Sequence, residues 1–217
     1  DSSTFGDTGQ VQVAIIAGVT ATATISASLS VTVDGVSSGG TVNGQSLDIT
    51  TTSSTVPFGS MTVNAYKAGA HDITVSTNAA SGYTTSIRQL DGTGMTNILN
   101  SSSNNIDGFR GAGGTATNAA PLAWAAGTNP SGTSSNTNTG WYGYTTEDSS
   151  LGTGTADRFT SPGNYWAPFD VTAYEVMYDS APVNAQKVRI GHMLEVNALQ
   201  PQGNYTGTIE YITTAIF

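Results

Sequence analysis

The stretch VQVAIIAGVTATATISASLSVTV, residues 11–33, has an apolar side chain at every odd position and Ser or Thr at every even position from Thr20 onward. A period of two is typical of a β-strand, whose side chains point to opposite faces in turn. Fully extended, the stretch would reach roughly 75 Å, whereas a compact chain of this length is about 45 Å across. We therefore expect either two strands separated at Gly18 or a first part that leaves the body and pairs elsewhere.

The rest of the sequence favours short strands, since Gly, Asn and Pro turns recur and no helical period is sustained. Asn43-Gly44 is a type I′ hairpin signal, and a single helical turn is predicted at 95–100. Strands are expected at 19–33, 56–63, 72–77, 83–89, 171–178, 187–196 and 205–217, with 72–77 and 83–89 forming a hairpin. The predicted fold is an all-β antiparallel β-sandwich, of jelly-roll or immunoglobulin-like type.

The predicted domain organisation has one body and one extension. Residues 1–18 form an N-terminal donor-strand extension, and residues 19–217 form a single β-sandwich domain. Between about 90 and 165 the periodicity fades into Ser-, Asn- and Gly-rich sequence. Loops of this length are uncommon in a compact domain unless they are functional, so we interpret this range as an elaborated insertion and not as a second domain.

Composition narrows the class of protein. Only 10% of the residues are charged, and six Lys plus Arg against fifteen Asp plus Glu give a net charge of −9, which disfavours nucleic acid and anionic membranes as partners. The chain has no cysteine for disulfides or thiolate chemistry. It opens at Asp1 without a basic and apolar leader and has no long apolar run. We expect a secreted, extracellular or cell-surface protein, its signal peptide removed, with no membrane span and no cofactor.

The first part of the alternating stretch is apolar on both faces, which fits burial between two sheets and would be a hazard if left exposed. We predict that it is a donor strand inserted into a neighbouring identical subunit, with Gly18 as the hinge. The alternative is an ordinary edge strand of its own domain. The predicted donor-strand residues are Val11, Val13, Ala14, Ile15, Ile16 and Ala17.

Aromatic residues recur in the loop-rich range. Trp141, Tyr142, Tyr144 and Trp166 could form a flat platform on which sugar rings stack, as in a carbohydrate-binding module, with cell-surface or matrix polysaccharide as partner. The other interpretation, which we favour, is local packing that fixes the insertion to the sandwich.

Other motifs give weak indications of chemistry. Ser37 lies in a G-x-S-x-G match, but the following Gly40-Thr-Val-Asn-Gly44 cannot begin the helix that a nucleophile elbow needs. His71 and His192 lack ligand spacing, and His192 is expected as a hydrogen-bonded core or interface residue. No catalytic, cofactor or metal residue is therefore predicted, and the protein is not expected to be an enzyme.

Acidic and asparagine residues leave further alternatives open. Glu147, Asp148, Asp157 and Asp170 could hold calcium or form a catalytic pair, although solvated loop acids are the default interpretation. Two tripeptides fit the N-glycosylation sequon, at Asn100 and Asn204. Gly111–Ala116 matches a dinucleotide fingerprint only superficially, since no strand precedes it and no helix follows it.

Three stretches together resemble a known class of proteins: LSVTVDGVSSGGTVNG, VPFGSMTVNAYKAGAHDITVSTNAASGYTTSI and ALQPQGNYTGTIEYITTAIF. They are similar to secreted, Thr-rich bacterial β-sandwich surface proteins, and the last also resembles biofilm fibre subunits of the TasA type and WxL-type surface domains. The Trp-x-Leu motif itself is absent, so peptidoglycan binding of the WxL kind is not expected. The fibre resemblance implies a pilus-like homopolymer in which residues 11–17 of one subunit are handed to the next.

Overall fold

The computed structural model describes residues 21–217, except 91–94, 98–104, 112–114 and 126–139. No helix occurs in this described part, and the strands confirm the all-β prediction. Their bounds are β1 (Leu29–Gly35), β2 (Thr41–Val42), β3 (Gln45–Ser46), β4 (Ala65–Thr77), β5 (Tyr83–Gln89), β6 (Thr96–Asn97), β7 (Asp107–Gly108), β8 (Leu122–Ala123), β9 (Gly140–Thr146), β10 (Tyr165–Pro168), β11 (Tyr174–Asp179), β12 (Val183–Val196), β13 (Tyr205–Thr206) and β14 (Ile209–Ala215).

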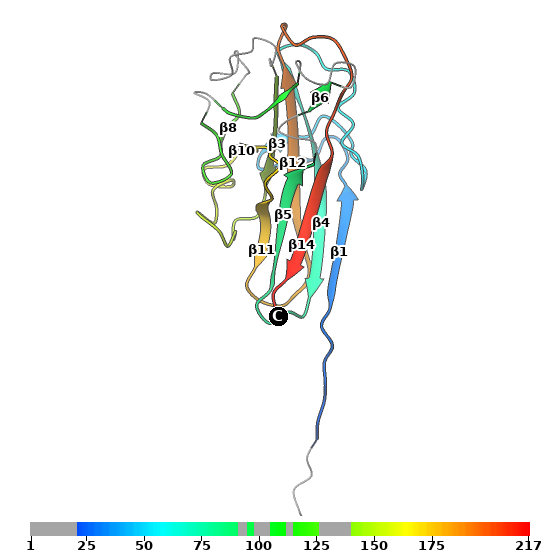
Figure 1. Ribbon diagram of the computed structural model, residues 1–217, viewed down its shortest axis with the longest axis vertical. Coiled ribbons are helices and arrows are strands. Elements are labelled where there is room, and N and C mark those ends of the chain that lie inside the picture. Colours follow the sequence, from blue (N-terminus) through cyan, green and yellow to red (C-terminus); the bar gives the residue numbers. More distant parts are fainter. Residues whose placement is uncertain (1–20, 91–94, 98–104, 112–114, 126–139) are drawn as a thin grey trace, which may run out of the picture.

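Two sheets of unequal width form the sandwich (Figure 1). The wide sheet has the order β1-β4-β12-β9-β10-β8, with the short β7 also pairing with β9. The narrow sheet has only three strands, in the order β11-β5-β14. All neighbours are antiparallel except β7 and β9. The wide sheet therefore extends past the narrow one.

The inner core lies between the sheets, and the period-two pattern of the long strands accounts for it. On β12 the side chains of Val188, Ile190, His192, Leu194 and Val196 face this core, as their spacing predicts. From the narrow sheet, Tyr83 and Ile87 of β5 pack against them. At about 1.5 to 3 kcal/mol for each large apolar side chain buried, this layer is the main source of stability.

A second core covers the outer face of the wide sheet. It contains Ala68 and Ala70 of β4, Met193 of β12 and two buried tryptophans. The β2–β3 hairpin covers part of this face, and its turn has positive φ at Asn43 and Gly44, which confirms the predicted hairpin. The segments around Phe109 and Leu122 cover the rest. Both faces are therefore buried along all of β9, in the middle of β4 and in the second half of β12.

Several predicted elements differ from the structure. The segments 72–77 and 83–89 are strands, but β4 and β5 lie in different sheets, so the connection is an arch between layers and not a hairpin. Residues 56–63 form no strand, because Lys67 Nζ is bonded to the carbonyls of Phe58 and Ser60 and holds them in an irregular path. At 95–97 the chain is extended and not helical.

The range expected to be loops also contains a central strand. β9 pairs with β12 along seven residues, from Gly140 opposite Val196 to Thr146 opposite Ile190. The sequence of β9 shows no alternation of apolar and polar residues, because both faces of the strand are buried and aromatic side chains lie on each face. Gly143 leaves room for Phe109, whose Cβ would lie 2.8 Å from a Cβ added at that glycine.

Candidate functional site

The predicted donor strand, Val11 to Ala17 with Gly18, lies outside the described residues. The neighbouring described segment, residues 21–28, is exposed throughout and forms no strand, so the predicted strand from Val19 begins only at Leu29. It leaves the body as an extended chain (Figure 1). Asn78 fixes the point of exit by accepting from the Ser28 N–H and donating to the Ser26 carbonyl. Beyond this point Ile25 is 86% exposed.

The aromatic platform is not present as an exposed surface. Trp141, Tyr142, Tyr144 and Trp166 are all buried, at 3% exposure or less. The tyrosines face the inner core and the tryptophans the outer one, because successive residues of β9 point to opposite faces. The Tyr144 hydroxyl accepts a hydrogen bond from Asn118, which also binds Arg158. These residues pack the structure together, and a sugar ring cannot reach them.

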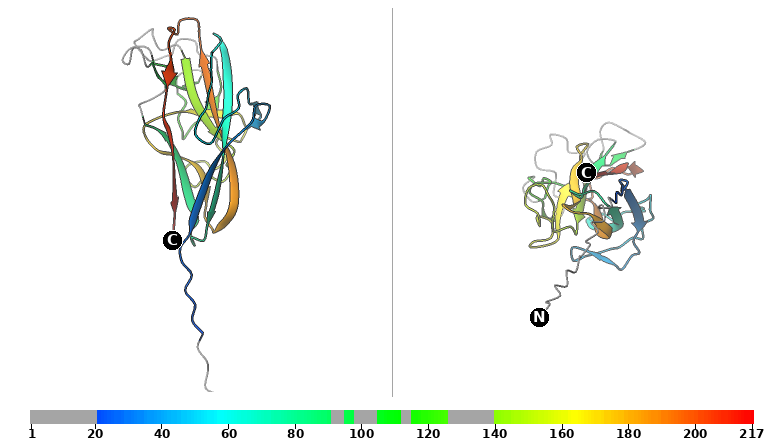
Figure 2. Two further views of the ribbon diagram at one scale, coloured as in Figure 1. Left: turned by 90° about the vertical axis from the view of Figure 1, so that its right-hand side faces the viewer. Right: turned by 90° about the horizontal axis from the view of Figure 1, so that it is seen from below.

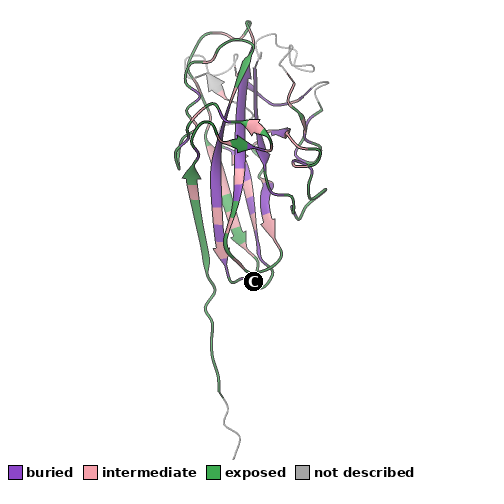
Figure 3. Cartoon of the chain, turned by 180° about the vertical axis from the view of Figure 1, so that it is seen from behind, coloured by how far each residue is buried: buried purple, intermediate pink, exposed green. Residues whose placement is uncertain are grey.

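The side of the sandwich formed by β1 and β14 is open. Val31 and Val33 of β1 lie opposite Val75 and Ile73 of β4 and therefore point toward the inner core. No described strand of the narrow sheet faces them, so Leu29 and Val31 remain 42% and 40% exposed. Figure 3 shows β1 exposed beside the mostly buried β4 and β12.

The other border of this open side is β14, the edge strand of the narrow sheet. Among the described residues it pairs only with β5, so one row of its backbone N–H and C=O groups has no strand partner. Tyr211, Thr213 and Ala215, which alternate with exposed residues along it, are only partly buried. An unpaired edge next to uncovered apolar side chains is a template for another strand. In the left view of Figure 2 this side faces the viewer, with β14 in red and β1 in blue.

A slot runs between these borders, and we call it the side slot. One rim is the irregular segment 53–63 and the other is 197–211, as the linings of its two cavities show. The lower cavity, of about 300 Å³, lies between Val33 of β1, the segment 53–58 and the start of β14, with His71 and Tyr142 in its floor.

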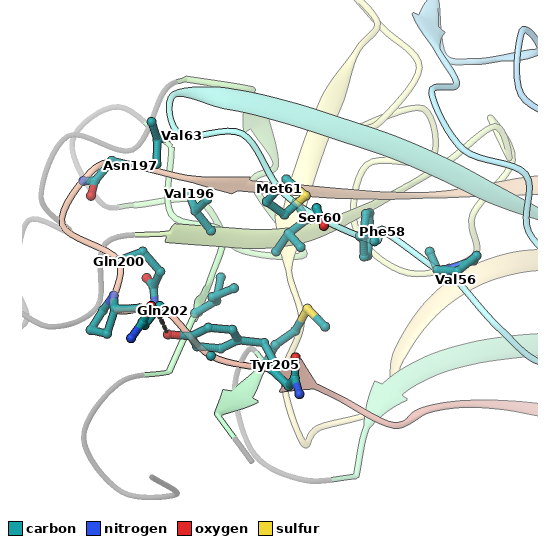
Figure 4. Close-up of a pocket in the computed structure, with 18 residues that line it drawn as sticks. Val56, Phe58, Ser60, Met61, Val63, Val196, Asn197, Gln200, Gln202 and Tyr205 are labelled. Atoms are coloured by element: carbon teal, nitrogen blue, oxygen red, sulfur yellow. Dashed lines mark hydrogen bonds between the residues drawn. The ribbon is translucent and has the colours of Figure 1, made fainter. Parts of the chain in front are cut away.

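The upper cavity, of about 730 Å³, continues the side slot toward the 197–205 loop. Figure 4 shows Phe58 and Met61 on one rim and Gln200 and Tyr205 on the other. The Tyr205 hydroxyl donates to the Pro201 carbonyl and accepts from the Gln200 amide, which holds the loop in shape. Leu194, Val196 and Ile106 contribute to the lining.

Beneath the lower cavity, two histidines share one tyrosine. The Tyr211 hydroxyl lies 3.1 Å from Nδ1 of His71 and 3.0 Å from Nε2 of His192. Phe169 stacks on His192. Burial lowers the pKa of His192 well below its ordinary value, and the neighbouring His71 lowers it further. Burial also lowers the pKa of His71, although the Thr52 and Thr55 carbonyls oppose this. Both rings are therefore neutral at pH 7 and fix β14 to the core.

Two of the acidic candidate residues, Glu147 and Asp148, accept hydrogen bonds within the fold. The Asp148 carboxylate is buried and accepts from the backbone N–H groups of Ser150 and Tyr178. Glu147 accepts from Asn43 N. In the described ranges, no three His, Cys, Asp or Glu side chains are placed to hold a metal ion. Ser37 is exposed and is followed by a turn and β2, so the nucleophile elbow is not formed.

No protein-family model matches the chain, and a search of curated proteins found no match. Nothing in the part of the chain that the structure describes forms a helix long and apolar enough to cross a membrane.

The sequence did not indicate the rims of the side slot. Val56–Val63 was expected to be a strand, and the amide-rich loop between Asn197 and Asn204 carries no periodic signal. One signal was available: Pro57 cannot donate a ladder hydrogen bond, which confines it to an edge or a strand start. The open edge of β14 becomes visible only when the strands of the two sheets are compared, because the narrow sheet has fewer strands than the wide one.

Proposed function

We propose that this protein is a structural subunit of an extracellular, pilus-like filament, in which the N-terminal segment of one copy completes the sandwich of the next. In this mode of binding, called β-augmentation, an extended segment joins an exposed sheet edge through main-chain hydrogen bonds, and its side chains enter pockets below. The proposed donor is residues 11–17, and the proposed acceptor is the edge of β14 together with the side slot.

The observation that carries this proposal is that no strand of the described ranges lies opposite β1. The wide sheet carries β1 at its edge, while the narrow sheet ends at β14. A single added strand beside β14 would cover Leu29 and Val31 and pair the free edge of β14 at the same time. An edge of this kind is a hazard that natural proteins usually blunt with charges, proline or a covering segment. On β14 the only charged residue is Glu210, which is bonded to Arg88.

The donor segment suits this acceptor. Val11, Val13 and Ile15 lie on one face, and Ala14 and Ile16 on the other, so the segment is apolar on the side facing the core and also tolerates cover on its outer side. It contains no charged residue. Burying such a segment does not require the desolvation of an unpaired charge, which would cost far more than an apolar side chain gains.

Transfer of a strand from one copy to another produces an open assembly. The donor and the acceptor are different surfaces, so the contact is heterologous and generates a filament unless the rotation closes a ring. Residues 21–28 already leave the body in extended form and point away from it (Figure 1). This supports a head-to-tail polymer in which each subunit is both donor and acceptor. A Thr- and Ser-rich chain with few charges supports the extracellular setting.

Deletion of residues 1–17 tests the function. We expect the truncated subunit to fold, because both cores are formed by residues from Val33 onward. It should stay monomeric in negative-stain microscopy, while the full chain forms filaments of uniform width. A synthetic peptide of residues 5–18 should bind the truncated subunit and raise its melting temperature. A peptide of the same composition in scrambled order is the control.

Two outcomes of these experiments would contradict the proposed function. If the truncated protein forms filaments of native appearance, the donor-strand function is wrong. If the full chain remains a monomer and the peptide does not bind the truncated subunit, the donor-strand function is wrong as well.

A further inference from the structure

We propose that the acceptor site extends beyond β14 into the upper cavity, and that the donor runs antiparallel to β14, with residues 19–23 of the neighbouring copy seated in that cavity. This inference rests on the proposed function. It adds to that function the direction in which the donor strand runs and a second binding region, the upper cavity. It also gives a role to the apolar residues Val19, Ala21 and Ala23, which lie beyond the predicted donor strand.

The charge of the upper cavity fits this occupant. None of the residues that line it is charged. Apolar side chains such as Met61 and Val196 line it together with the amides of Asn197 and Gln200. Between Asp7 and Asp34 the chain likewise has no charged residue, although the whole protein carries a net charge of −9. A neutral segment with apolar and hydroxyl side chains in alternation matches a cavity lined by apolar groups and amides.

The two cavities belong to one continuous site. Val56, Phe58 and Met95 line both the lower and the upper cavity. The two cavities therefore adjoin, and a strand placed beside β14 would pass from the lower cavity, beside Val33, to the upper cavity at the 197–205 loop.

The direction of insertion follows from where the chain leaves the body. Residues 21–28 leave at the end where the 78–82 loop lies, and β14 runs toward that same end (Figures 1 and 2). In a head-to-tail stack the exiting segment enters the next subunit from the opposite end, so residue 11 lies deepest. The donor then runs antiparallel to β14 and parallel to β1. Antiparallel pairing is also slightly the more stable per residue.

Strand register assigns the residues. Tyr211 is bonded to His71, whereas Leu194 and Val196 in the upper cavity pair with Lys67 and Ala65 of β4. Lys67 and Ala65 are four and six residues from His71 along β4, which corresponds to about 13 and 20 Å. If Ile15 lies beside Tyr211, then Val19 and Ala21 reach the upper cavity.

The same register limits the spacing of the subunits. In this register, residue 11 of the donor subunit lies level with Ala215 of the acceptor subunit. This position is near Leu29 of the acceptor subunit. The chain from residue 11 to residue 29 spans at most about 60 Å when extended. The filament should therefore have an axial repeat of at most about 60 Å, which power spectra of straight filaments measure directly.

Paired cysteines test the polarity and the upper cavity in the full chain, which has no cysteine of its own. The matched pairs are A21C/M61C, for the upper cavity, and V11C/V31C, for the β1 edge. The swapped pairs A21C/V31C and V11C/M61C are the controls. Each variant is first checked for a wild-type circular dichroism spectrum, and filaments are then treated with a short bis-maleimide. Covalent ladders on denaturing gels report contacts between subunits, because links within one chain give no ladder.

Ladders from both matched pairs, with at least a tenfold lower yield from the swapped pairs, are the expected result. Ladders from the swapped pairs alone would mean parallel insertion and would overturn the inference while the filament function stands. Ladders from V11C/V31C alone would also overturn it, because the upper cavity would then be empty of donor. If no pair gives a ladder and the wild-type protein forms no filaments, both the inference and the proposed function are wrong.

Discussion

The two long sides of this sandwich are built from different residues. On the side of β9 and β10, large aromatic side chains fill the space: Trp124 stacks on Phe109 with the ring centroids 4.4 Å apart, and Trp166 meets Trp124 edge to face. On the side of β1 and β14 the side slot stays open, although aromatic side chains line it as well. Its lining combines aromatic residues such as Phe58 and Tyr205 with Val, Met, Thr and amide side chains, and Leu29 and Val31 are uncovered.

This difference separates two tasks within one domain. The aromatic side carries the polar links that stabilise a single copy, such as the buried Arg158, which donates to Asn118 and to the Thr153 carbonyl. The open side leaves apolar area unburied in a single copy. Stability of the subunit and capacity for assembly should therefore respond to different substitutions.

Replacing Trp166 with Ala should cause the largest loss in the free energy of unfolding of the subunit. Trp166 is fully buried, and removal of a large aromatic side chain from a core typically costs about 3 to 5 kcal/mol. Urea unfolding followed by fluorescence would measure the change. A loss below about 1 kcal/mol would contradict the view that this side holds the subunit together. Retention on a polysaccharide gel should be the same for the variant as for the native protein.

Lowering the pH should have the next largest effect, through His71 and His192. Their pKa values in the folded state are lowered by burial, so the unfolded chain binds more protons. Stability is therefore full above about pH 6.5 and falls below it, by at most about 1.4 kcal/mol per pH unit for each histidine. Unfolding curves at pH 7.5 and 5.5 would measure the loss.

A matched variant separates this effect from the carboxylates. In H71Q/H192Q the slope between pH 7.5 and 5.5 should disappear. Asp72, whose pKa is lowered chiefly by the hydrogen bond from Arg189, adds stability that is lost only further toward acid. An unchanged slope in the double variant would show that other groups titrate.

Glu210→Gln should have a small effect. Glu210 accepts from Arg88 at 2.6 Å, but both side chains are more than a third exposed. Exposed ion pairs contribute about 0 to 1 kcal/mol. Thermal unfolding at low and high salt would measure the difference, and a loss above about 2 kcal/mol would mean that the narrow sheet depends on this pair.

Val31→Glu should have the smallest effect on the subunit and a complete effect on assembly. Val31 is 40% exposed, so its replacement should change the free energy of unfolding by about 0.5 kcal/mol or less. In the polymer the new carboxylate would be buried without a partner, which is strongly unfavourable. Sedimentation should find monomers only. Ser30→Glu, on the outer face of the same strand, is the control and should still polymerise.

The sequence predicted the architecture in two situations: where a strand has one polar face, and where the residues of a turn indicate a hairpin. Alternation at 187–196 placed His192 and its neighbours in the core, and Asn43-Gly44 located a hairpin. β9 was missed because both of its faces are buried, which removes the alternation. The separation of β4 and β5 into two sheets was missed as well, since a five-residue loop at 78–82 fits a hairpin or an arch equally.

Local sequence indicated a candidate donor, which stays a prediction, but it indicated no acceptor. Residues 11–17 are conspicuous because they are apolar on both faces, which local sequence reveals. The acceptor has no local signal: Val33, His71 and Tyr211 meet through pairings between segments far apart in the chain. The aromatic residues were the more visible candidates, and burial on β9 and β10 accounts for them instead.

The pairing of β5 with β14, from Ile209 opposite Gln89 to Ala215 opposite Tyr83, also sets an order of events in time. Contacts between segments so distant in sequence form slowly, because a long loop must close first. A chain made from its N-terminus emerges with residues 11–17 long before residues 209–215 exist. In the proposed filament every subunit therefore has its donor early and its acceptor only after β14 has paired, so a subunit that is still folding can be captured by a finished neighbour before it can capture another.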